Sequence, residues 1–216
     1  MTASRLAQAR KGRRGFSLIE ILIVIAILGI ALMLGLSGLN SVFKRQRLNS
    51  TAEEVKTLAG RALSEMQNRN VRTFFIVGKY VAGFGTDVAV AIDVNGNGQL
   101  DEAFDPNGDG LFDDAAGTVV LWRTRVPQDI ALSNTALTTQ TFNTQWTRPT
   151  SGPVSAGLLC DFVGRATKPG AIPAMITGPA TMQFCHREMI EGSLTPLVTY
   201  TVSIGPLFKA SIARVP

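Results

Sequence analysis

The chain opens with a long apolar run that a single acid interrupts. Residues 21–36 contain no polar side chain, and Phe16, Leu18 and Ile19 extend the run toward the N-terminus around Glu20. The run reaches the roughly 20 apolar residues that a membrane-spanning helix requires, so it predicts a transmembrane helix over about residues 16–39. Because a carboxylate inside such a helix costs about 2.5–3.5 kcal/mol, we expect Glu20 to have a positively charged partner.

Beyond residue 44 the apolar positions repeat at steps of three and four, which predicts an amphipathic helix with one buried stripe. No proline occurs before residue 106. We therefore expect one continuous helix over residues 16–70, roughly 80 Å long at 1.5 Å per residue. A capping box at Ser50 and Glu53 leaves open a separate helix that begins there. The stripe consists of Leu48, Ala52, Val55, Ala59, Ala62 and Met66, with Leu58 and Leu63 alongside.

From residue 71 onward the pattern changes to short alternating runs separated by Gly, Pro and Asn, which is typical of β-strands. The predicted strands are residues 73–77, 88–92, 118–122, 197–204 and 208–212. The roughly 145 residues of this region suffice for one domain with its own core. The predicted fold class is therefore α+β: a long N-terminal helix, transmembrane and then amphipathic, followed by a β-rich, sandwich-like globular head over residues 71–216.

Basic residues precede the apolar run and set its orientation. Arg10, Lys11, Arg13 and Arg14 lie directly before Gly15, and by the positive-inside rule they keep the N-terminus in the cytoplasm. The small-residue cleavage site of a secretory signal is missing after the run. Together with Arg5, these residues account for the whole net charge of +5. The rest of the chain is formally neutral, so the basic pI is no argument for nucleic-acid binding.

The segment Gly15-Phe16-Ser17-Leu18-Ile19-Glu20, between a basic leader and an apolar run, resembles the prepilin signature of type IV pilins and type II secretion pseudopilins. The resemblance implies that a prepilin peptidase cuts between Gly15 and Phe16, removes residues 1–15 and N-methylates Phe16. Glu20 would then pair with the Phe16 amine of a neighbouring subunit in a filament. A carboxylate in the first helical turn also lies favourably at the positive end of the helix dipole. The alternative is a plain single-pass anchor.

An acidic tandem repeat of period twelve follows the second predicted strand, over residues 93–116: DVNGNGQLDEAF and then DPNGDGLFDDAA. Each copy has oxygen-bearing side chains at its first, third, fifth and ninth positions and Gly at its sixth, a spacing that wraps calcium. Phe104 and Ala116 replace the last acid of an EF-hand, so the pattern is more similar to the shorter DxNxDGxxD calcium repeats. The alternative is a solvated loop with Asn-Gly and Asp-Gly turns. The predicted ligands of a structural calcium are Asp93, Asn95, Asn97, Asp101, Asp105, Asn107, Asp109 and Asp113.

Cysteine and histidine are scarce. Cys160 and Cys185 are the two cysteines, and outside the cytoplasm they are predicted to form one disulfide. The alternative is two buried thiols. His186 is the single histidine, which is insufficient for a Cys/His metal site or a convincing nucleophile–base pair. No phosphate-binding loop or zinc motif is present, so we predict no catalytic residues and do not expect an enzyme.

Four features together resemble the GspH/FimT group of minor pilins and pseudopilins. They are the long helix, residues 61–69 leading into a strand, the Asp-x-Asn-x-Asn-Gly loop and residues 162–166 (FVGRA). The resemblance implies a β-sandwich-like head at or near a filament tip. Members that bind DNA use a Gly-Arg-rich C-terminal motif, whereas residues 205–209 here read GPLFK. What remains is a loose basic set that favours ordinary solvated surface: Arg165, Lys168, Arg187, Lys209 and Arg214.

These resemblances imply a minor pilin or pseudopilin that works by assembly and recognition. Its implied partners are other pilins or pseudopilins, the prepilin peptidase and an inner-membrane assembly platform. Its implied location is the inner membrane, single-pass with the head in the periplasm, and then a pilus or pseudopilus. Type II secretion and type IV pilus assembly both stay open, and a DNA-binding or adhesive tip pilin is the alternative.

Overall fold

The structure is a computed structural model that describes residues 16–100, 112–114, 117–133, 140–149, 154–170, 172–192 and 198–215, without the side chains of residues 34–38. The chain divides into two compact units, Met1–Val42 and Phe43–Pro216. The first contains the N-terminal part of the long helix. The second, called the head below, contains the rest of that helix and all the strands.

Helix α1 (Leu18–Arg69) is 52 residues long and confirms the prediction of one continuous helix. The alternative of a separate helix beginning at Ser50 is wrong. The Ser50 hydroxyl donates to the Arg47 carbonyl at 2.9 Å, one turn back inside α1. A side chain bonded in that way does not act as an N-cap, which instead accepts from amides that follow it.

The predicted apolar stripe of α1 forms one side of the head's core. Leu48, Ala52, Val55, Ala59 and Ala62 are fully buried, and Leu58 and Met66 are 3% exposed. Thr73, the first strand residue after the helix, donates its hydroxyl to the Ala62 carbonyl at 2.8 Å. This buried bond ties the start of the sheet to the last turns of the helix.

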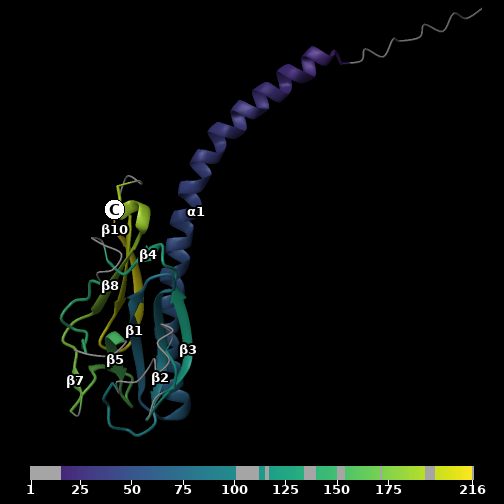
Figure 1. Ribbon diagram of the computed structural model, residues 1–216. Coiled ribbons are helices and arrows are strands. Elements are labelled where there is room, and N and C mark those ends of the chain that lie inside the picture. The colour runs from purple at the N-terminus through teal and green to yellow at the C-terminus, as the bar shows by residue number, and fades with distance from the viewer. Residues whose placement is uncertain are drawn as a thin grey trace, which may run out of the picture. The chain divides into compact units, whose positions relative to one another are not determined.

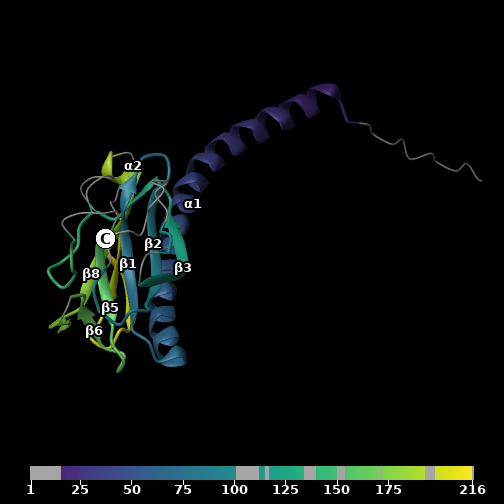
Figure 2. The same ribbon diagram turned by 60° about the horizontal axis from the view of Figure 1, so that its bottom comes forward.

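The strands of the head form two antiparallel sheets that lie beside the C-terminal half of α1 (Figures 1 and 2). The six-stranded sheet has the order β3-β2-β1-β5-β6-β7 and the four-stranded sheet the order β10-β9-β8-β4. The bounds are β1 (Thr73–Val81), β2 (Gly85–Asp93), β3 (Thr118–Val126), β4 (Ile130–Ala131), β5 (Val154–Cys160), β6 (Ala166–Lys168), β7 (Ala174–Met175), β8 (Ala180–His186), β9 (Thr199–Ile204) and β10 (Ala210–Val215), with the short helix α2 (Arg187–Ile190) after β8. The α+β prediction is therefore confirmed.

The five predicted strands correspond to β1, β2, β3, β9 and β10, and sequence reasoning missed β4 to β8. Strand β5 reads VSAGLLC and is almost completely buried, so it lacks the alternation of a half-exposed strand. Strand β8 does alternate, with Ala180, Met182 and Phe184 buried between partly exposed residues. Its signal was present in the sequence. The two-residue strands β4 and β7 carry no detectable period.

The main core lies between α1 and the two sheets. Phe75 and Val77 from β1 and Leu158 from β5 contribute from the larger sheet, and Met182 and Phe184 from β8 contribute from the smaller one. Each of these side chains is fully buried. Burying apolar surface of this kind contributes about 25 cal/mol per Å², which is the main force that holds the helix to the sheets.

A second core covers the other face of the six-stranded sheet. Phe74 and Ile76 from β1 and Leu159 from β5 are fully buried there, because Leu100 and Phe112 from the acidic loop pack on them. Leu100 and Phe112 occupy the eighth position of their respective repeats. The described parts of the acidic segment, at Leu100 and Phe112, therefore cover this face of the sheet.

Two glycines make room for this cover. A Cβ atom at Gly157 would lie 2.7 Å from Leu100 Cδ1, and one at Gly78 would lie 3.1 Å from Phe112 Cζ and 3.2 Å from the Asp87 carbonyl oxygen. A side chain at either position would push an apolar anchor of the loop away from the sheet. Glycine is therefore required for this close approach.

Candidate functional site

The N-terminal site begins at the first turn of α1. The Ser17 amide donates to Glu20 Oε2 at 2.9 Å, and the Glu20 amide donates to the Ser17 carbonyl at 3.0 Å. This places the carboxylate at the positive end of the helix dipole, as predicted. Among the described residues, no basic side chain forms an ion pair with Glu20. Gly15 and the rest of the leader lie outside the described residues.

Apolar side chains on both sides of Glu20, from Phe16 to Met33, are exposed. Phe16 is 83% exposed, Leu18 77%, Ile25 60% and Met33 79%. An exposed apolar surface of this extent marks an interaction site with another protein or a membrane. A membrane-spanning helix is not found in the part of the chain that the structure describes, in which the side chains of residues 34–38 are left out.

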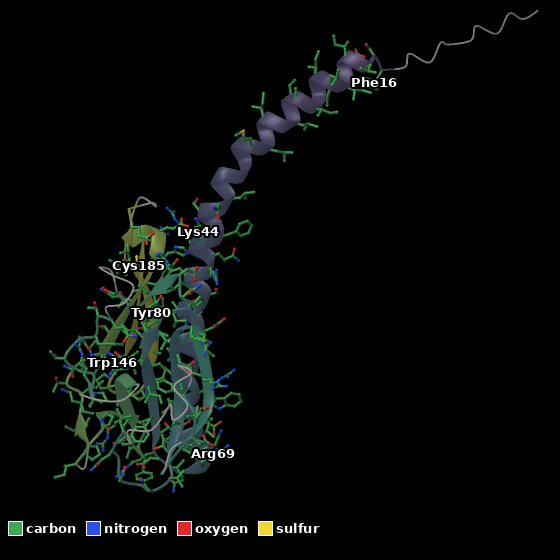
Figure 3. The ribbon with its side chains drawn as sticks, viewed as in Figure 1. Phe16, Lys44, Arg69, Tyr80, Trp146 and Cys185 are labelled. Carbon is green, nitrogen blue, oxygen red and sulfur yellow. The ribbon has the colours of Figure 1, made fainter. Side chains whose placement is uncertain are left out.

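The predicted disulfide between Cys160 and Cys185 is wrong, because both cysteines are free, buried thiols. Cys160 lies opposite Thr73 in the β1–β5 ladder, and Thr73 contacts Ala62 of α1. Cys185 lies three residues before Glu188, which forms an ion pair with Lys44 of α1. The two cysteines are therefore near different parts of the helix. Figure 3 shows Cys185 and Lys44 toward one end of the head and Arg69 at the other. Lys44 and Ala62 are roughly 27 Å apart along the helix, and a disulfide requires Cα atoms within about 7 Å.

The two thiols are also poorly reactive. Burial raises the pKa of Cys160 to about 12 and the pKa of Cys185 to about 11. A thiolate, not a thiol, is the nucleophile and the metal ligand, so neither cysteine is prepared for catalysis or metal binding at neutral pH. Each sulfur instead fills space in the main core. The alternative weighed from the sequence, two buried thiols, is the correct one.

His186 has a local structural role. It is 4% exposed; its Nδ1 accepts from the Glu188 amide at 3.3 Å as the N-cap of α2, and its Nε2 lies 3.2 Å from Asp129 Oδ2. Asp129 also pairs with Arg47 of α1 at 3.2 Å. The sequence offered no signal for this cluster, since its members come from three separate segments.

Four of the eight predicted calcium ligands lie within the described residues: Asp93, Asn95, Asn97 and Asp113. The first copy of the repeat is compact. Asp93 Oδ2 accepts from the Gly98 amide at 2.9 Å, Asn95 Oδ1 from the Asn97 amide at 3.0 Å, and Asn97 Oδ1 from the Gln99 amide at 2.7 Å. Asp113 lies 4.0 Å from Arg123. Asp101, Asp105, Asn107 and Asp109 lie outside the described residues.

Sequence reasoning missed one buried acid that positions the acidic loop. Asp87 of β2 is 3% exposed, and its Oδ2 accepts from the Phe112 amide at 2.9 Å. It thereby holds Phe112 over the outer face of the sheet. Asp87 directly precedes the apolar run of residues 88–92. An acid at the edge of a buried strand was the available signal, because a buried carboxylate requires a specific partner.

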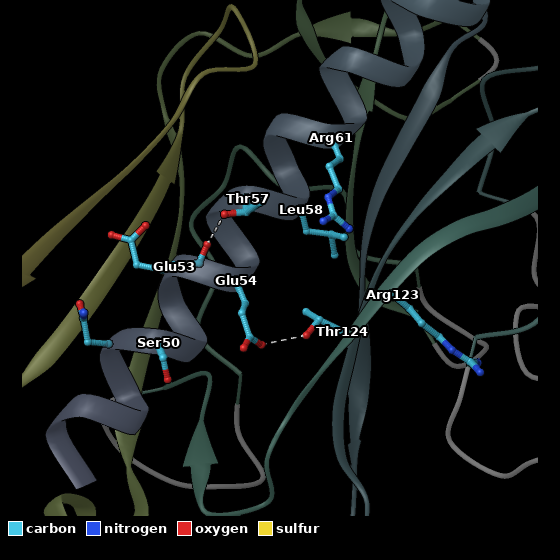
Figure 4. A pocket seen from close by; sticks show the side chains of 9 residues that line it. Ser50, Glu53, Glu54, Thr57, Leu58, Arg61, Arg123 and Thr124 are labelled. Carbon is cyan, nitrogen blue, oxygen red and sulfur yellow. Dashed lines mark hydrogen bonds between the residues drawn. The ribbon is translucent and has the colours of Figure 1, made fainter. Parts of the chain in front are cut away.

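A groove of about 540 Å³ separates the head part of α1 from the edge strand β3 (Figure 4). Contacts bridge it: Thr124 donates to Glu54 at 3.1 Å, Trp122 Nε1 donates to Glu65 at 3.2 Å, and the Arg61 guanidinium lies 4.6 Å from the centre of the Trp122 ring. Hydrogen bonds from Arg69 and Trp122 lower the pKa of Glu65. These contacts attach the edge strand β3 to the helix beside the groove.

The loose basic set does not gather into one patch. Arg165 pairs with Asp161 at 2.9 Å, and Arg187 pairs with Glu191 at 2.7 Å. Arg165 follows β5 at the Thr73 end of the head, whereas Arg187 begins α2 at the Lys44 end. Arg165 and Arg187, each paired with an acid and separated from one another, give little of the local positive field that DNA binding uses.

Comparison with known proteins adds one finding. No curated protein and no solved structure matched the chain. Residues 10–36 match the family described as the prokaryotic N-terminal methylation motif. The matched range contains the basic residues, Gly15, Phe16 and Glu20, and it ends before the head. The match therefore leaves the resemblance to the GspH/FimT group untested, and it shows that the chain carries a type IV prepilin-like N-terminal signal.

Proposed function

We propose that this protein is a structural subunit of a type IV pilin-like filament, and specifically a minor pilin or pseudopilin that acts near the filament tip. A prepilin peptidase cuts between Gly15 and Phe16 and methylates Phe16. The mature subunit is held in the inner membrane by its apolar helix, with the head in the periplasm. An assembly platform then transfers it into a pilus or a type II secretion pseudopilus.

The observation that carries the proposal is the combination of the N-terminal methylation motif at residues 10–36 with the exposure of the apolar part of α1. Side chains such as Leu22, Ile25 and Leu28 are between 55% and 60% exposed. Within the described residues, the chain provides no surface that covers them. A filament core or a bilayer supplies that cover, because both remove apolar surface from water.

Glu20 fits a role in registering one subunit against the next. Its carboxylate accepts from the Ser17 amide through Oε2, and an ionised carboxylate has about four acceptor sites. It can therefore keep its bond to Ser17 and also accept from the Phe16 amine of a neighbour. In an apolar filament core such a pair is favoured strongly over an unpaired carboxylate, which would remain buried without compensation.

Assembly, rather than catalysis, is the proposed work of the head. The burial of both thiols and the capping role of His186 support this assignment. Under the proposal, the head contacts the heads of neighbouring pilins or pseudopilins and presents a surface to cargo or to the outside.

An adhesive tip is the second candidate, and one surface favours it. Phe162 is 51% exposed, Val163 73% and Met175 50%, and these residues line a cavity of about 260 Å³ together with Arg72 and Arg165. Exposed apolar side chains around a cavity suit the apolar part of a partner. DNA binding, the other tip function, has less support because Arg165 is already paired with Asp161.

The first test is a clean deletion in the native host, scored in parallel for sheared surface pili and for exoproteins trapped in the periplasm. Loss of pili with normal secretion assigns the protein to a type IV pilus. Trapped exoproteins with normal pili assign it to a type II secretion system. Normal pili together with normal secretion contradict the proposal.

Complementation with variants then tests the N-terminal site. Gly15→Val should leave the leader attached, which mass spectrometry of the N-terminus detects. Glu20→Ala should be processed and methylated but should not restore the phenotype. Glu53→Ala is the matched control, because Glu53 is an exposed acid on the same helix. A Glu20→Ala subunit that assembles normally would contradict the registry role.

A further inference from the structure

The first charged residues after Glu20 are Lys44, Arg45 and Arg47, and two of these three cations have acidic partners in the head. Lys44 forms an ion pair with Glu188 of α2, and Arg47 Nη1 lies 3.2 Å from Asp129 Oδ2. Among the described residues, Arg45 forms no ion pair and no hydrogen bond. The described part of the chain therefore leaves its charge uncompensated.

Arg45 lies at the start of the packed stripe of α1. It precedes Leu48 and Ala52 by three and seven positions, so it lies on the same side of the helix as these buried residues. The residue is half-buried, and its Nε is shielded from water without a hydrogen-bond partner. A partly buried guanidinium without an acceptor is costly. The two terminal nitrogens of Arg45 are therefore left for an anion from outside the head.

The length of the apolar segment indicates which anion lies within reach. Residues 16–43 contain Glu20 as their single charged residue. The helical part of this segment, from Leu18 onward, rises about 40 Å at 1.5 Å per residue. A bilayer with its headgroups is about 40–45 Å thick. When the segment spans a bilayer, Arg45 therefore lies in the headgroup layer on the side of the head, where the anions are lipid phosphates.

We propose that Arg45 binds the phosphate group of an anionic phospholipid in this headgroup layer. A guanidinium can donate to two phosphate oxygens at once, which gives it both charge and geometric fit. The contact fixes the start of the head at the membrane surface before the subunit enters a filament. The inference rests on the proposed membrane anchoring of the subunit, and it adds the residue and the chemical group that make the contact.

The test uses the purified full-length chain in detergent micelles, titrated with phosphatidylglycerol or phosphatidylcholine and followed by native mass spectrometry. Arg45→Gln should lower the affinity for phosphatidylglycerol about fivefold, the effect expected of one basic residue near anionic lipid. The affinity for phosphatidylcholine should change less, because its choline group already compensates the phosphate charge. The basic leader is present in wild type and variant alike, so it cancels from this comparison.

Arg69→Gln is the matched control. Arg69 is a cation on the same helix, but it lies at the other end of the head and is paired with Glu65 at 2.7 Å. The control should bind phosphatidylglycerol as tightly as the wild type. An unchanged affinity in Arg45→Gln, or an equal loss in Arg69→Gln, overturns the proposal.

Two further measurements separate this site from other roles of Arg45. Millimolar inorganic phosphate should not displace the bound lipid, and displacement would overturn the lipid assignment in favour of a free anion. Without added lipid, Arg45→Gln should keep the melting temperature of the wild type, because Arg45 has no partner in the described head; a lower value indicates a structural role and contradicts the site. Lipid binding is measured on isolated subunits, so its failure is distinguishable from a failure of the filament role.

Discussion

Two regions of the chain are rich in apolar side chains, yet they differ completely in how those side chains are used. In the first unit, Leu18, Val24 and Ile30 of α1 are 54–77% exposed. In the head, Leu48, Val55 and Ala59 of the same helix are fully buried. The difference teaches that the head builds a core from its own side chains, whereas the apolar side chains of the first unit remain exposed among the described residues.

The sequence pattern explains why the same helix behaves in both ways. Residues 21–36 are apolar on every side, so no orientation on the head could bury them all. Residues 48–66 are apolar along one stripe, and their other positions are polar, which suits a helix with one packed face and one solvated face.

The largest effect should come from placing one charge in each region. Val55→Asp puts a carboxylate among the apolar side chains of the main core and should destabilise the head by more than about 4 kcal/mol, because burying a charge in an apolar environment is costly. Val24→Asp, at a position 54% exposed, should leave the melting temperature unchanged in detergent and abolish filament assembly. A large loss of stability from Val24→Asp would break the comparison.

Truncation of Phe112 should have the next largest effect on the stability of the head. It tests whether the outer face of the six-stranded sheet has a core of its own. Phe112→Ala should cost about 3 kcal/mol, the lower part of the range for buried Phe, because Phe112 is 2% exposed over the second core. Phe84→Ala is the matched control, at a position 49% exposed. Chemical denaturation of both variants measures the difference, and equal costs would contradict the existence of a second core.

A smaller effect is expected where the helix meets the first strand. Thr73→Val keeps the size of the side chain and removes the buried hydrogen bond to the Ala62 carbonyl. It should cost about 1–2 kcal/mol, since the carbonyl loses a partner without contact with water. Thr57→Val is the control, because its bond to the Glu53 carbonyl is exposed. A cost for Thr73→Val as small as that of the control would show that this attachment point is unimportant.

The smallest effect should be a pH dependence at the other end of the packed helix. Hydrogen bonding from Lys44 lowers the pKa of Glu188 from 4.5. The folded pKa is below the unfolded one, so the pair stabilises the head above pH 4.5 and loses its contribution as the pH falls. Glu188→Gln should therefore flatten the decline of the melting temperature in acid.

The effect at Glu188 is small because both side chains are partly exposed and water screens such pairs. Glu191→Gln, which removes an exposed partner of Arg187, serves as the control. Identical acid profiles for wild type and Glu188→Gln would contradict the role of the Lys44–Glu188 pair.

Sequence reasoning succeeded where the information is local. The methylation motif, the position of Glu20 in the first turn and the stripe from Leu48 to Met66 all depend on residues within a few turns of one another. Strand β9 and its hairpin to β10 also follow local rules, because the turn closes with the Phe208 amide donating to the Gly205 carbonyl at 2.9 Å.

What the sequence determined by itself is the N-terminal signal, the continuous helix with its two kinds of surface and the β-rich head, because helical and strand periods are written into neighbouring residues. Only the tertiary structure decided that Cys160 and Cys185 are too far apart to bond, and that Leu100 and Phe112 of an acidic repeat cover the sheet opposite Gly157 and Gly78. These outcomes depend on which strands pair and which faces meet. Such contacts join residues that are distant along the chain, and composition and spacing carry no record of them.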